Sequence, residues 1–289
     1  MTAITVIAIL AAAATIYGFV AMDSCERIKV APKGKKKKYQ VQEVPETGIL
    51  FMVIMAVALI VHYIAAAKYF GNETDMNCFI AWGDMIFKDG IGNFYSSDSF
   101  TDYPPGYMYI LYMVGAIRHV LGVAWNSTLS VMLTKTPAII ADLATAYLLF
   151  RIAGKRWTQK GAGILTAIYL FAPAVLLDGA IWGQTDAVFT FFVVLMIYLV
   201  TERKLIPSYF VFAVAVLVKP QSLIFTPVLI YGIIDQVFLD GFDWKNFWKN
   251  LGLGLAAIAM IALLMLPFGF KDALSQYTET LASYKFASV

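Results

Sequence analysis

One stretch of the chain, residues 70–107, gathers the carboxylates whose types and spacing could do chemistry. It reads FGNETDMNCFIAWGDMIFKDGIGNFYSSDSFTDYPPGY, and most of the sequence around it is apolar. Its acidic residues, which are accompanied by a single lysine at position 88, are Glu73, Asp75, Asp84, Asp89, Asp98 and Asp102. An acidic, aromatic and partly helical loop next to a hydrophobic helix suits a reaction at the boundary between membrane and water.

Asp75 lies just past a hydrophobic run, at the start of a segment with helical spacing. In a helix, Phe79 and Trp82 would share the face of Asp75, while Asp84 and Lys88 would form an exposed i,i+4 pair. The Asp75 carboxylate could act as a general base that takes the proton from an acceptor hydroxyl. It could instead be an acidic residue at a helix N-terminus, an arrangement worth less than about 1 kcal/mol. Position alone favours this second interpretation.

Asp102 and Tyr103 precede a proline pair in DYPPGYMY. Pro104 restricts Tyr103 to an extended conformation, and Pro105 can begin a helix. One role of Asp102 is therefore that of an N-cap in a rigid turn. A second role is to bind a sugar together with Tyr103, because carboxylates accept hydrogen bonds from hydroxyls while aromatic rings cover C–H groups.

Five charged residues lie in apolar surroundings, namely Lys135, Asp142, Asp178, Asp186 and Lys219. A charge at the centre of a membrane helix costs at least about 2.5–3.5 kcal/mol, so such residues are functional or paired. Lys135 and Asp142 are two helical turns apart, which is too far for a direct ion pair. Asp178 and Asp186 flank the tip LLDGAIWGQTD, near the outer interface. Lys219 could neutralise a lipid phosphate, or it could extend its ammonium to the interface as a snorkelling lysine.

The composition excludes an ordinary soluble domain. Of the 289 residues, 60% are hydrophobic and 14% are charged, and the mean hydropathy is +0.73. The apolar runs are long enough to cross roughly 30 Å of hydrocarbon, and they do not alternate as the strands of a β-barrel would. We expect an all-α, polytopic membrane protein with about eight transmembrane helices. The net charge of +3 comes from short basic loops and gives no indication of nucleic-acid binding.

The charge pattern predicts how these helices are oriented. Residues 3–21 are expected to be an anchor helix rather than a signal peptide, because no basic residue precedes the apolar run. The lysine-rich loop that follows should be cytoplasmic, since positively charged loops remain on that side. This N-terminal unit, residues 1–47, precedes a transmembrane unit at 48–289. With the amino terminus outside, the loop at 70–107 becomes extracytoplasmic.

The remaining apolar runs predict the other spans and one exception. The expected spans are at about 48–69, 130–150, 162–178, 186–201, 206–218, 222–238 and 250–268. Residues 105–121 are also apolar, but a full crossing there would invert every later loop, so we expect a juxtamembrane or re-entrant helix on the outer side. Pro220 lacks an N–H group and should break the helix near Lys219. The basic clusters that would then face the cytoplasm are those at 151–160, 203–204 and 245–249.

Motifs for cofactors and metals are missing from the sequence. It has no glycine-rich phosphate loop, no DxD pair, no HExxH and no nucleophile elbow. Its histidines are His62 and His119, which argues against a metal site with two histidine ligands. We expect no cofactor, and the sequence leaves a divalent metal open.

Four stretches together resemble the GT-C superfamily of polyprenyl-phosphate-sugar-dependent membrane glycosyltransferases. They are DMNCFIAWGDMIFKDG followed by FY, DYPPGYMYIL, TPAIIADLATAYLL, and APAVLLDGAIWGQTD followed by VKPQSLIFTP. Each motif alone is weak, but DYPPGY, WGQTD and KPQ in this order form a fairly specific set between about 70 and 235. Their order and spacing resemble the N-terminal part of prokaryotic mannosyl- and glucosyltransferases and, more distantly, the lumenal glucosyltransferases of N-glycan precursor assembly.

The resemblance implies an inverting hexosyltransferase that moves a sugar from a polyprenyl-phosphate donor to an acceptor hydroxyl on the extracytoplasmic face. It implies Asp75 as the catalytic base and Lys219 as the cation beside the leaving phosphate. The other residues that it places at the substrates are Asp102, Tyr103, Trp182, Gln184, Asp186 and Gln221. The implied location is the plasma membrane of a prokaryote rather than the endoplasmic reticulum.

The resemblance also implies a set of partners. These are the lipid-linked donor, a glycan, lipid or protein acceptor, and membrane lipids, with no nucleic acid. Members of the superfamily continue for several helices beyond the point where this sequence stops. We therefore expect either that the sequence is a fragment or that a partner subunit supplies the missing helices.

Two other classes of function fit the same residues. A transporter or lipid flippase would also place Asp and Lys on proline-broken helices, but it would show an inverted repeat, which is not evident here. A non-catalytic membrane scaffold subunit fits if further C-terminal helices are absent. An Asp75→Asn variant separates these classes, because an enzyme would lose turnover while still binding its lipid donor and a scaffold would be unaffected.

Overall fold

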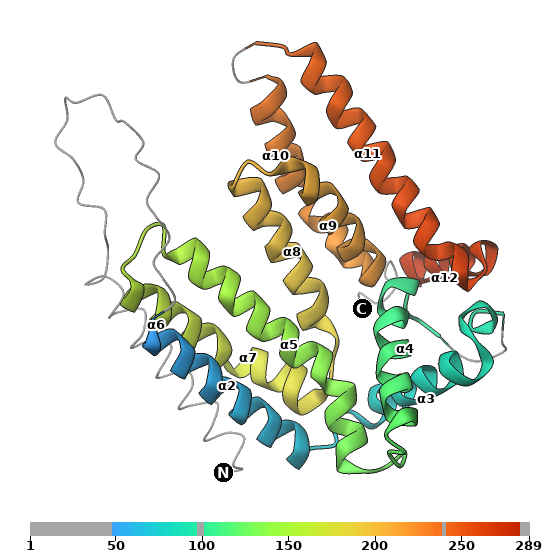
Figure 1. Ribbon diagram of the computed structural model, residues 1–289. Helices are drawn as coiled ribbons and strands as arrows, with labels where there is room; N and C mark the ends of the chain where they lie inside the picture. Colours follow the sequence, from blue (N-terminus) through green and yellow to red (C-terminus); the bar gives the residue numbers. More distant parts are fainter. Residues whose placement is uncertain (1–47, 97–100, 239–240, 284–289) are drawn as a thin grey trace.

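The computed structural model describes residues 48–96, 101–238 and 241–283, and this part of the chain is all-α, as expected (Figure 1). Its α-helices are α2 (Ile49–Lys68), α3 (Glu73–Asp89), α4 (Pro105–Val120), α5 (Thr128–Ala153), α6 (Gln159–Leu170), α7 (Pro173–Val175), α8 (Asp186–Thr201), α9 (Leu205–Val218), α10 (Thr226–Val237), α11 (Trp244–Met265) and α12 (Phe270–Ser283). Its 3-10 helices are η2 (Ile91–Asn93), η4 (Pro220–Phe225) and η5 (Leu266–Phe268), and η3 (Leu176–Trp182) is a π-helix. The expected anchor helix and the lysine-rich loop after it lie outside the described residues.

The chain is a polytopic membrane protein, but fewer helices than expected can cross a bilayer unaided. Within the described residues, three helices, α2, α5 and α11, are long and apolar enough, and a fourth span results if α6 and the segment Pro173–Trp182, bent by 44°, are counted as one. Of the seven spans expected in this part of the chain, three or four meet this criterion. The reason is length, because α8 and α9 are apolar but have only 16 and 14 residues.

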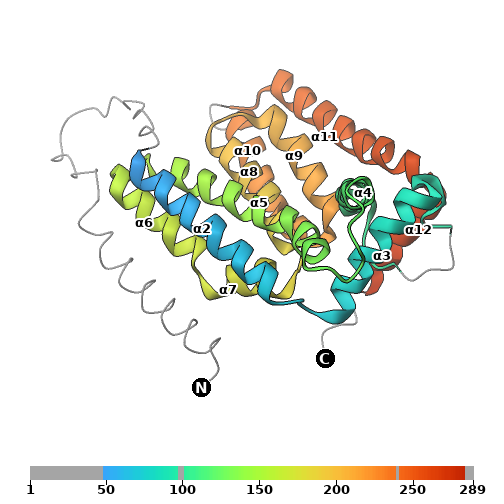
Figure 2. The same cartoon turned by 60° about the horizontal axis from the view of Figure 1, so that its bottom comes forward.

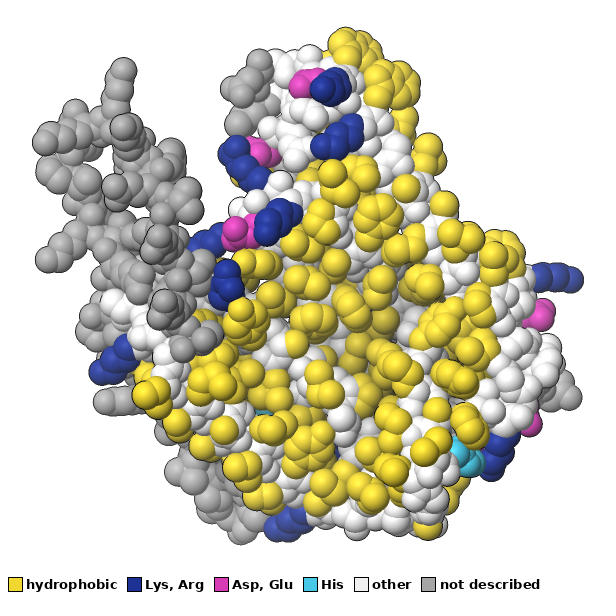
Figure 3. Space-filling model, viewed as in Figure 1, with side chains coloured by type: hydrophobic (Ala, Val, Ile, Leu, Met, Phe, Trp, Pro, Cys, Tyr) yellow, Lys and Arg dark blue, Asp and Glu magenta, His cyan; other side chains and the backbone are white. Residues whose placement is uncertain are grey.

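The outer helices expose apolar side chains that a soluble protein would bury. Ile64 on α2 is 62% exposed, and Ile258 on α11 is 65% exposed. Figure 3 shows apolar side chains covering most of this face of the molecule. A continuous apolar surface of this kind is stabilised by contact with lipid tails rather than with water.

The long helix α5 forms the middle of the bundle. α2 and α6 pack on one side of it, and α8 packs on the other, followed by α9 (Figures 1 and 2). α3 and α4 pack against each other at one end of the bundle, next to α12. This arrangement brings the start of α3 close to the end of η3, although the two are more than a hundred residues apart in sequence.

Side chains at the helix starts account for several of the boundaries. Asn72, Ser127 and Thr158 precede α3, α5 and α6, and each accepts a hydrogen bond from the backbone N–H three residues later. Such caps satisfy an N–H group that has no partner inside the helix, and each stabilises it by about 1 kcal/mol. Pro105 starts α4, as its fixed backbone angle predicts.

The break predicted at Pro220 is confirmed. α9 ends at Val218, and Lys219 takes an extended conformation with φ −150° and ψ 118°. The chain then continues as η4, so that α10 begins at Thr226 rather than near 222. The interruption leaves Lys219 at a bend, where its side chain reaches Asp186 and the Tyr103 ring.

The helix at 105–120 packs along α3, and this contact changes the pairing of Asp84. The expected exposed pair between Asp84 and Lys88 is wrong, because Asp84 instead accepts a hydrogen bond from Arg118 Nη1 at 2.8 Å. The Arg118 side chain is only 4% exposed. Gly83 and Gly115 allow this approach, since a Cβ on Gly115 would lie 2.2 Å from the Gly83 carbonyl oxygen. Whether this helix lies at the membrane surface stays a prediction.

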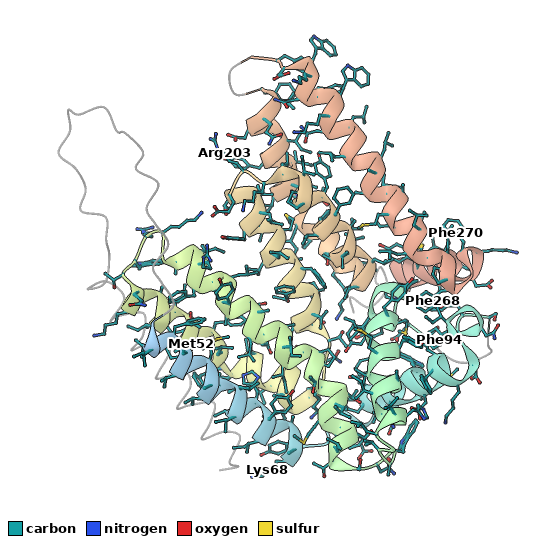
Figure 4. The ribbon with its side chains drawn as sticks, viewed as in Figure 1. Met52, Lys68, Phe94, Arg203, Phe268 and Phe270 are labelled. Carbon is teal, nitrogen blue, oxygen red and sulfur yellow. The ribbon has the colours of Figure 1, made fainter. Side chains whose placement is uncertain are left out.

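Three basic clusters lie at one end of the bundle, and we call this end the basic edge. They are in the turn between α5 and α6, in the turn between α8 and α9, and at the start of α11, where Lys245 and Lys249 lie. Lys155 in the first turn pairs with Glu202 in the second, and Arg203 Nη2 lies 3.8 Å from Asp235 Oδ2 at the end of α10. Figure 4 places Arg203 and Lys68 at opposite ends of the molecule.

Candidate functional site

Side chains that the sequence singled out come together at the end of the bundle opposite the basic edge. They come from the start of α3, the turn before α4, the segment after η3, the start of α8 and the bend after α9. We call this set the polar edge, and its members are Asp75, Tyr103, Trp182, Gln184, Asp186 and Lys219. The Lys68 end of α2 lies beside it (Figure 4).

The carboxylate of Asp75 is held by two donors from a distant part of the chain. Its Oδ2 atom accepts hydrogen bonds from Trp182 Nε1 at 3.0 Å and from Gln184 Nε2 at 2.6 Å. The backbones are also tied, because the Asn72 N–H donates to the Trp182 carbonyl oxygen at 2.9 Å. Asn72 Oδ1 in turn accepts from the Asp75 N–H at 3.1 Å. The start of α3, which carries Asp75, is therefore held by hydrogen bonds both to its own cap and to the segment after η3.

The π-helix η3 and the glycine after it set the directions of Trp182 and Gln184. The Asp178 carbonyl oxygen accepts from the N–H groups of both Gly183 and Gln184 at 3.0 Å, which closes the wide turn. Gly183 then takes φ +91°, a conformation that other residues rarely adopt. A Cβ atom there would lie 2.4 Å from Met76 Sδ, so a larger residue would also displace the Met76 side chain.

Tyr103 connects the acidic and the basic members of the polar edge. Its hydroxyl donates to Gln184 Oε1 at 3.4 Å and accepts from Thr185 Oγ1 at 3.3 Å. The Lys219 ammonium lies 5.9 Å from the centre of the Tyr103 ring, within reach of a cation–π interaction, and it pairs with Asp186. Asp75 and Lys219 thus share one edge and are linked through Gln184 and Tyr103.

Asp102 and Gln221 lie at the margin of this network. The Asp102 side chain is exposed, yet partial burial among its neighbours raises the pKa of its carboxyl, and the Asp75 carboxylate raises it further. Lys219 acts in the opposite direction and lowers it. Gln221 is exposed beyond the proline bend, and no side-chain hydrogen bond joins it to the polar edge within the described ranges. The structure therefore does not bring Gln221 into the polar edge.

Lys135 has a structural role at the site that the sequence did not predict. Its side chain is 1% exposed, and its ammonium donates to the carbonyl oxygens of Tyr69 at 2.8 Å, Ala180 at 3.1 Å and Ile181 at 2.9 Å. It thereby joins the end of α2 to the end of η3, next to Trp182. Its apolar surroundings in the sequence indicated a paired charge, but carbonyl partners leave no signal in a side-chain pattern.

The buried acidic residue of α5 has a similar internal role. Asp142 is 2% exposed and accepts a hydrogen bond from the Tyr169 hydroxyl at 3.0 Å.

In the residues that the structure describes, no three His, Cys, Asp or Glu side chains come together as metal ligands would. The polar edge itself therefore offers carboxylates, amide groups, aromatic faces and one ammonium.

These groups are suited to holding a polar headgroup. Carboxylate and amide oxygens accept hydrogen bonds from hydroxyls, aromatic faces cover C–H groups, and an ammonium attracts an anion. All of them lie at the end of the bundle where α2 leaves the apolar span, so that they can meet the polar part of a lipid.

A comparison with protein-family models gives one match. The family is GPI transamidase subunit PIG-U, and the match covers residues 83–286. None of the curated proteins compared with the chain matches it. PIG-U is a family of the eukaryotic endoplasmic reticulum membrane, and its members work with the other subunits of GPI transamidase.

This match overturns the expected activity. The resemblance to GT-C glycosyltransferases was misleading, and the expected hexosyltransferase reaction with a polyprenyl-phosphate sugar donor is wrong. The expected role of Asp75 as the base of that reaction falls with it. The physical reason is that short motifs of carboxylates, aromatics and a lysine at a membrane surface indicate contact with a polar lipid, but they do not distinguish binding from transfer. The scaffold-subunit alternative agrees better with the family.

Proposed function

We propose that this chain, which belongs to the PIG-U family of GPI transamidase subunits, is a non-catalytic membrane subunit of that complex whose polar edge binds the headgroup of its glycolipid substrate. GPI transamidase attaches GPI anchors to proteins, so it must hold a glycolipid at the membrane surface. The observation that carries the proposal is the connection from Asp75 to Lys219: Gln184 and Tyr103 are joined to Asp75 by hydrogen bonds, and the Lys219 ammonium lies 5.9 Å from the centre of the Tyr103 ring.

The polar edge offers hydrogen-bonding oxygens, aromatic faces and a positive charge, which match the hydroxyls, the C–H groups and the phosphate of such a headgroup. Asp75 and Gln184 offer oxygens to sugar hydroxyls. Trp182, half exposed, and Tyr103 offer aromatic faces to the C–H groups of a sugar ring. Lys219 offers a positive charge to a phosphate, and its side chain is only 12% exposed, so the charge acts in a partly desolvated place.

The internal hydrogen bonds favour binding over transfer. Both donors to Asp75 meet the same oxygen, Oδ2, and Lys219 is paired with Asp186. Such contacts fix the positions of the side chains before a ligand arrives, which lowers the entropy cost of binding. In this proposal the reaction itself takes place in other subunits of the complex.

The orientation follows from the positions of the basic turns. We place the basic edge in the cytoplasm, because positively charged loops stay there. The polar edge then lies at the lumenal face of the endoplasmic reticulum membrane, and the acidic stretch at 70–107 is lumenal. The span at α2 connects the two edges.

The test uses cells that lack their own PIG-U subunit and express a GPI-anchored reporter. With Asp75→Asn or Lys219→Met, we expect the reporter at the cell surface to fall roughly tenfold, because charge-assisted contacts to the headgroup are lost. Co-purification with the other subunits should stay at the level of the unchanged chain. Glu73→Gln is the matched control, since Glu73 is exposed on the same turn of α3.

Two results would contradict the proposal. Full reporter display with both Asp75→Asn and Lys219→Met would show that the polar edge does not hold the headgroup. Failure of the unchanged chain to co-purify with the other subunits would contradict its place in the complex.

A further inference from the structure

A pocket lies next to the polar edge and shares Trp182 with it. It lies between the end of α2 and the end of η3 and has a volume of about 340 Å³. We call it the Trp182 pocket, and its lining residues are Tyr69, Phe70, Gly71, Asn72, Ile181 and Trp182. Small-molecule sites range from about 300 to 1,000 Å³, so this volume corresponds to a small ligand.

The pocket contains an aromatic surface with a fixed orientation. Trp182 is 50% exposed, which leaves part of its indole ring open to a ligand. The indole N–H is bonded to Asp75 Oδ2 at 3.0 Å, and the Trp182 carbonyl oxygen accepts from the Asn72 N–H at 2.9 Å. An exposed tryptophan that is held at both its ring and its backbone can receive the C–H face of a flat ligand without losing further freedom.

Polar groups lie at the rim of this aromatic surface. Asn72 lines the pocket directly, and Asp75 reaches its rim through the hydrogen bond to Trp182. The Asn72 side-chain carbonyl is used by the Asp75 N–H, and its amide group carries two donors of its own. A carboxylate and an amide beside an indole ring can bond adjacent hydroxyls of a ligand whose opposite face is apolar.

Lys135 holds the two walls of the pocket together. The Lys135 ammonium bonds the carbonyl oxygens of both Tyr69 and Ile181, which belong to opposite walls. Gly71 has φ +105°, and a Cβ atom there would lie 2.2 Å from the Trp182 carbonyl oxygen. The absence of that side chain lets the end of α2 pass directly against Trp182, so the pocket is formed before a ligand binds.

We infer that the Trp182 pocket binds one neutral pyranose ring, stacked on the indole of Trp182 and hydrogen-bonded by Asn72 and Asp75. The cavity, the fixed aromatic face and the two rim groups carry the inference. It rests on the proposed function only for the source of the sugar, which would be the glycan of the GPI lipid. As a consequence, the polar edge and this pocket would hold neighbouring parts of one headgroup.

The test measures binding of methyl α-mannopyranoside and methyl α-glucopyranoside to the purified full chain in lipid nanodiscs, by saturation-transfer NMR. We expect saturable binding with the strongest transfer to the ring C–H groups. Trp182→Leu should weaken this binding about tenfold, whereas Trp182→Phe, which keeps an aromatic face, should stay within about threefold. Trp248→Leu is the matched control, because Trp248 is 60% exposed on α11, away from the pocket.

A second variant guards against a loss of folding in Trp182→Leu. Asn72→Ser keeps a side chain that can cap α3 but removes the amide donors, and we expect it to weaken pyranoside binding about fivefold with unchanged thermal unfolding. Equal binding by Trp182→Leu and the unchanged chain, no saturable pyranoside binding, or preferential binding of glycerol 3-phosphate would each overturn the inference.

This experiment needs neither the other subunits nor anchoring in cells. A chain that fails to bind a pyranoside but still loses reporter display with Asp75→Asn would refute the sugar pocket and leave the polar edge in place. A chain that binds a pyranoside but shows full reporter display with Asp75→Asn and Lys219→Met would support the sugar pocket and refute headgroup binding by the polar edge.

Discussion

The two ends of the bundle both carry paired lysines or arginines, but they hold them differently. At the basic edge, the Lys155 side chain is 38% exposed and that of Arg203 is 79% exposed, and each has a single acidic partner. At the polar edge, Lys219 is 12% exposed, lies over the Tyr103 ring and pairs with Asp186. The first kind of pair is open to water and salt, and the second is packed among aromatic side chains.

The difference shows how the same residue types serve two purposes. An exposed ion pair contributes about 0–1 kcal/mol and is screened by salt, so the charges of the basic edge matter for orientation in the membrane. A partly desolvated charge interacts more strongly with its neighbours and with a ligand. Burial and aromatic contacts, rather than the charge itself, separate the candidate binding site from the basic edge.

The largest expected effect comes from removing the ammonium beneath the polar edge. We expect Lys135→Met to lower the free energy of unfolding by about 3 kcal/mol or more, because one buried and two partly buried carbonyl groups lose their donor at about 1–3 kcal/mol each. Chemical unfolding in detergent micelles measures this change. Lys68→Met, on an exposed lysine at the end of α2, should leave stability unchanged. Equal stability of the two variants would show that Lys135 does not hold the two helix ends together.

A smaller difference in stability is expected between alanine substitutions at two glycines with positive φ. Gly71 and Gly90 have φ +105° and +86°, so an alanine at either position costs roughly 1–2 kcal/mol of backbone strain. A Cβ on Gly71 would also meet the Trp182 carbonyl oxygen at 2.2 Å, while nothing lies within 4 Å of one on Gly90. We expect Gly71→Ala to cost a further 1–3 kcal/mol or so, measured as the difference in melting temperature between the two variants. Equal melting temperatures would mean that the contact with Trp182 is not tight.

The smallest effect is expected at the basic edge. Lys155→Met should change the free energy of unfolding by less than about 1 kcal/mol, and the difference should shrink further at high salt. Lys219→Met should cost more, about 1–2 kcal/mol, because it also loses the contact with the Tyr103 ring. Unfolding of both variants at low and high salt provides the measurement. A larger loss of stability from Lys155→Met than from Lys219→Met would contradict this contrast between the two edges.

Much of this arrangement was predictable from local sequence rules. The apolar runs predict the helices, and Pro220 predicts the bend at Lys219. The expected N-cap role of Asp102 is wrong, because Pro104 occupies the N-cap position of α4 and no side chain caps this helix. The structure brings together six of the predicted site residues, from Asp75 to Lys219. Their roles in binding stay predictions, because proximity alone does not identify a ligand.

Other features depend on tertiary contacts that the sequence does not encode locally. The partner of Asp84 is Arg118 on a neighbouring helix rather than Lys88 one turn away. Lys135 bonds carbonyl oxygens from two separate segments, which no side-chain pattern reveals. In the described part of the chain, only three or four of the expected spans are long enough to cross a bilayer unaided, because hydropathy measures polarity whereas a crossing also requires length.

The π-helix before Trp182 has a consequence for how this segment tolerates length changes. Its wide turn holds more residues than an α-helix of the same height. A chain one residue shorter between Leu176 and Trp182 would close as an ordinary helix, and each residue of an α-helix rotates the chain by about 100°. The indole would then turn away from the carboxylate that receives its N–H. Insertions and deletions in this one short segment should therefore be far less tolerated than in the loops at the opposite end of the molecule.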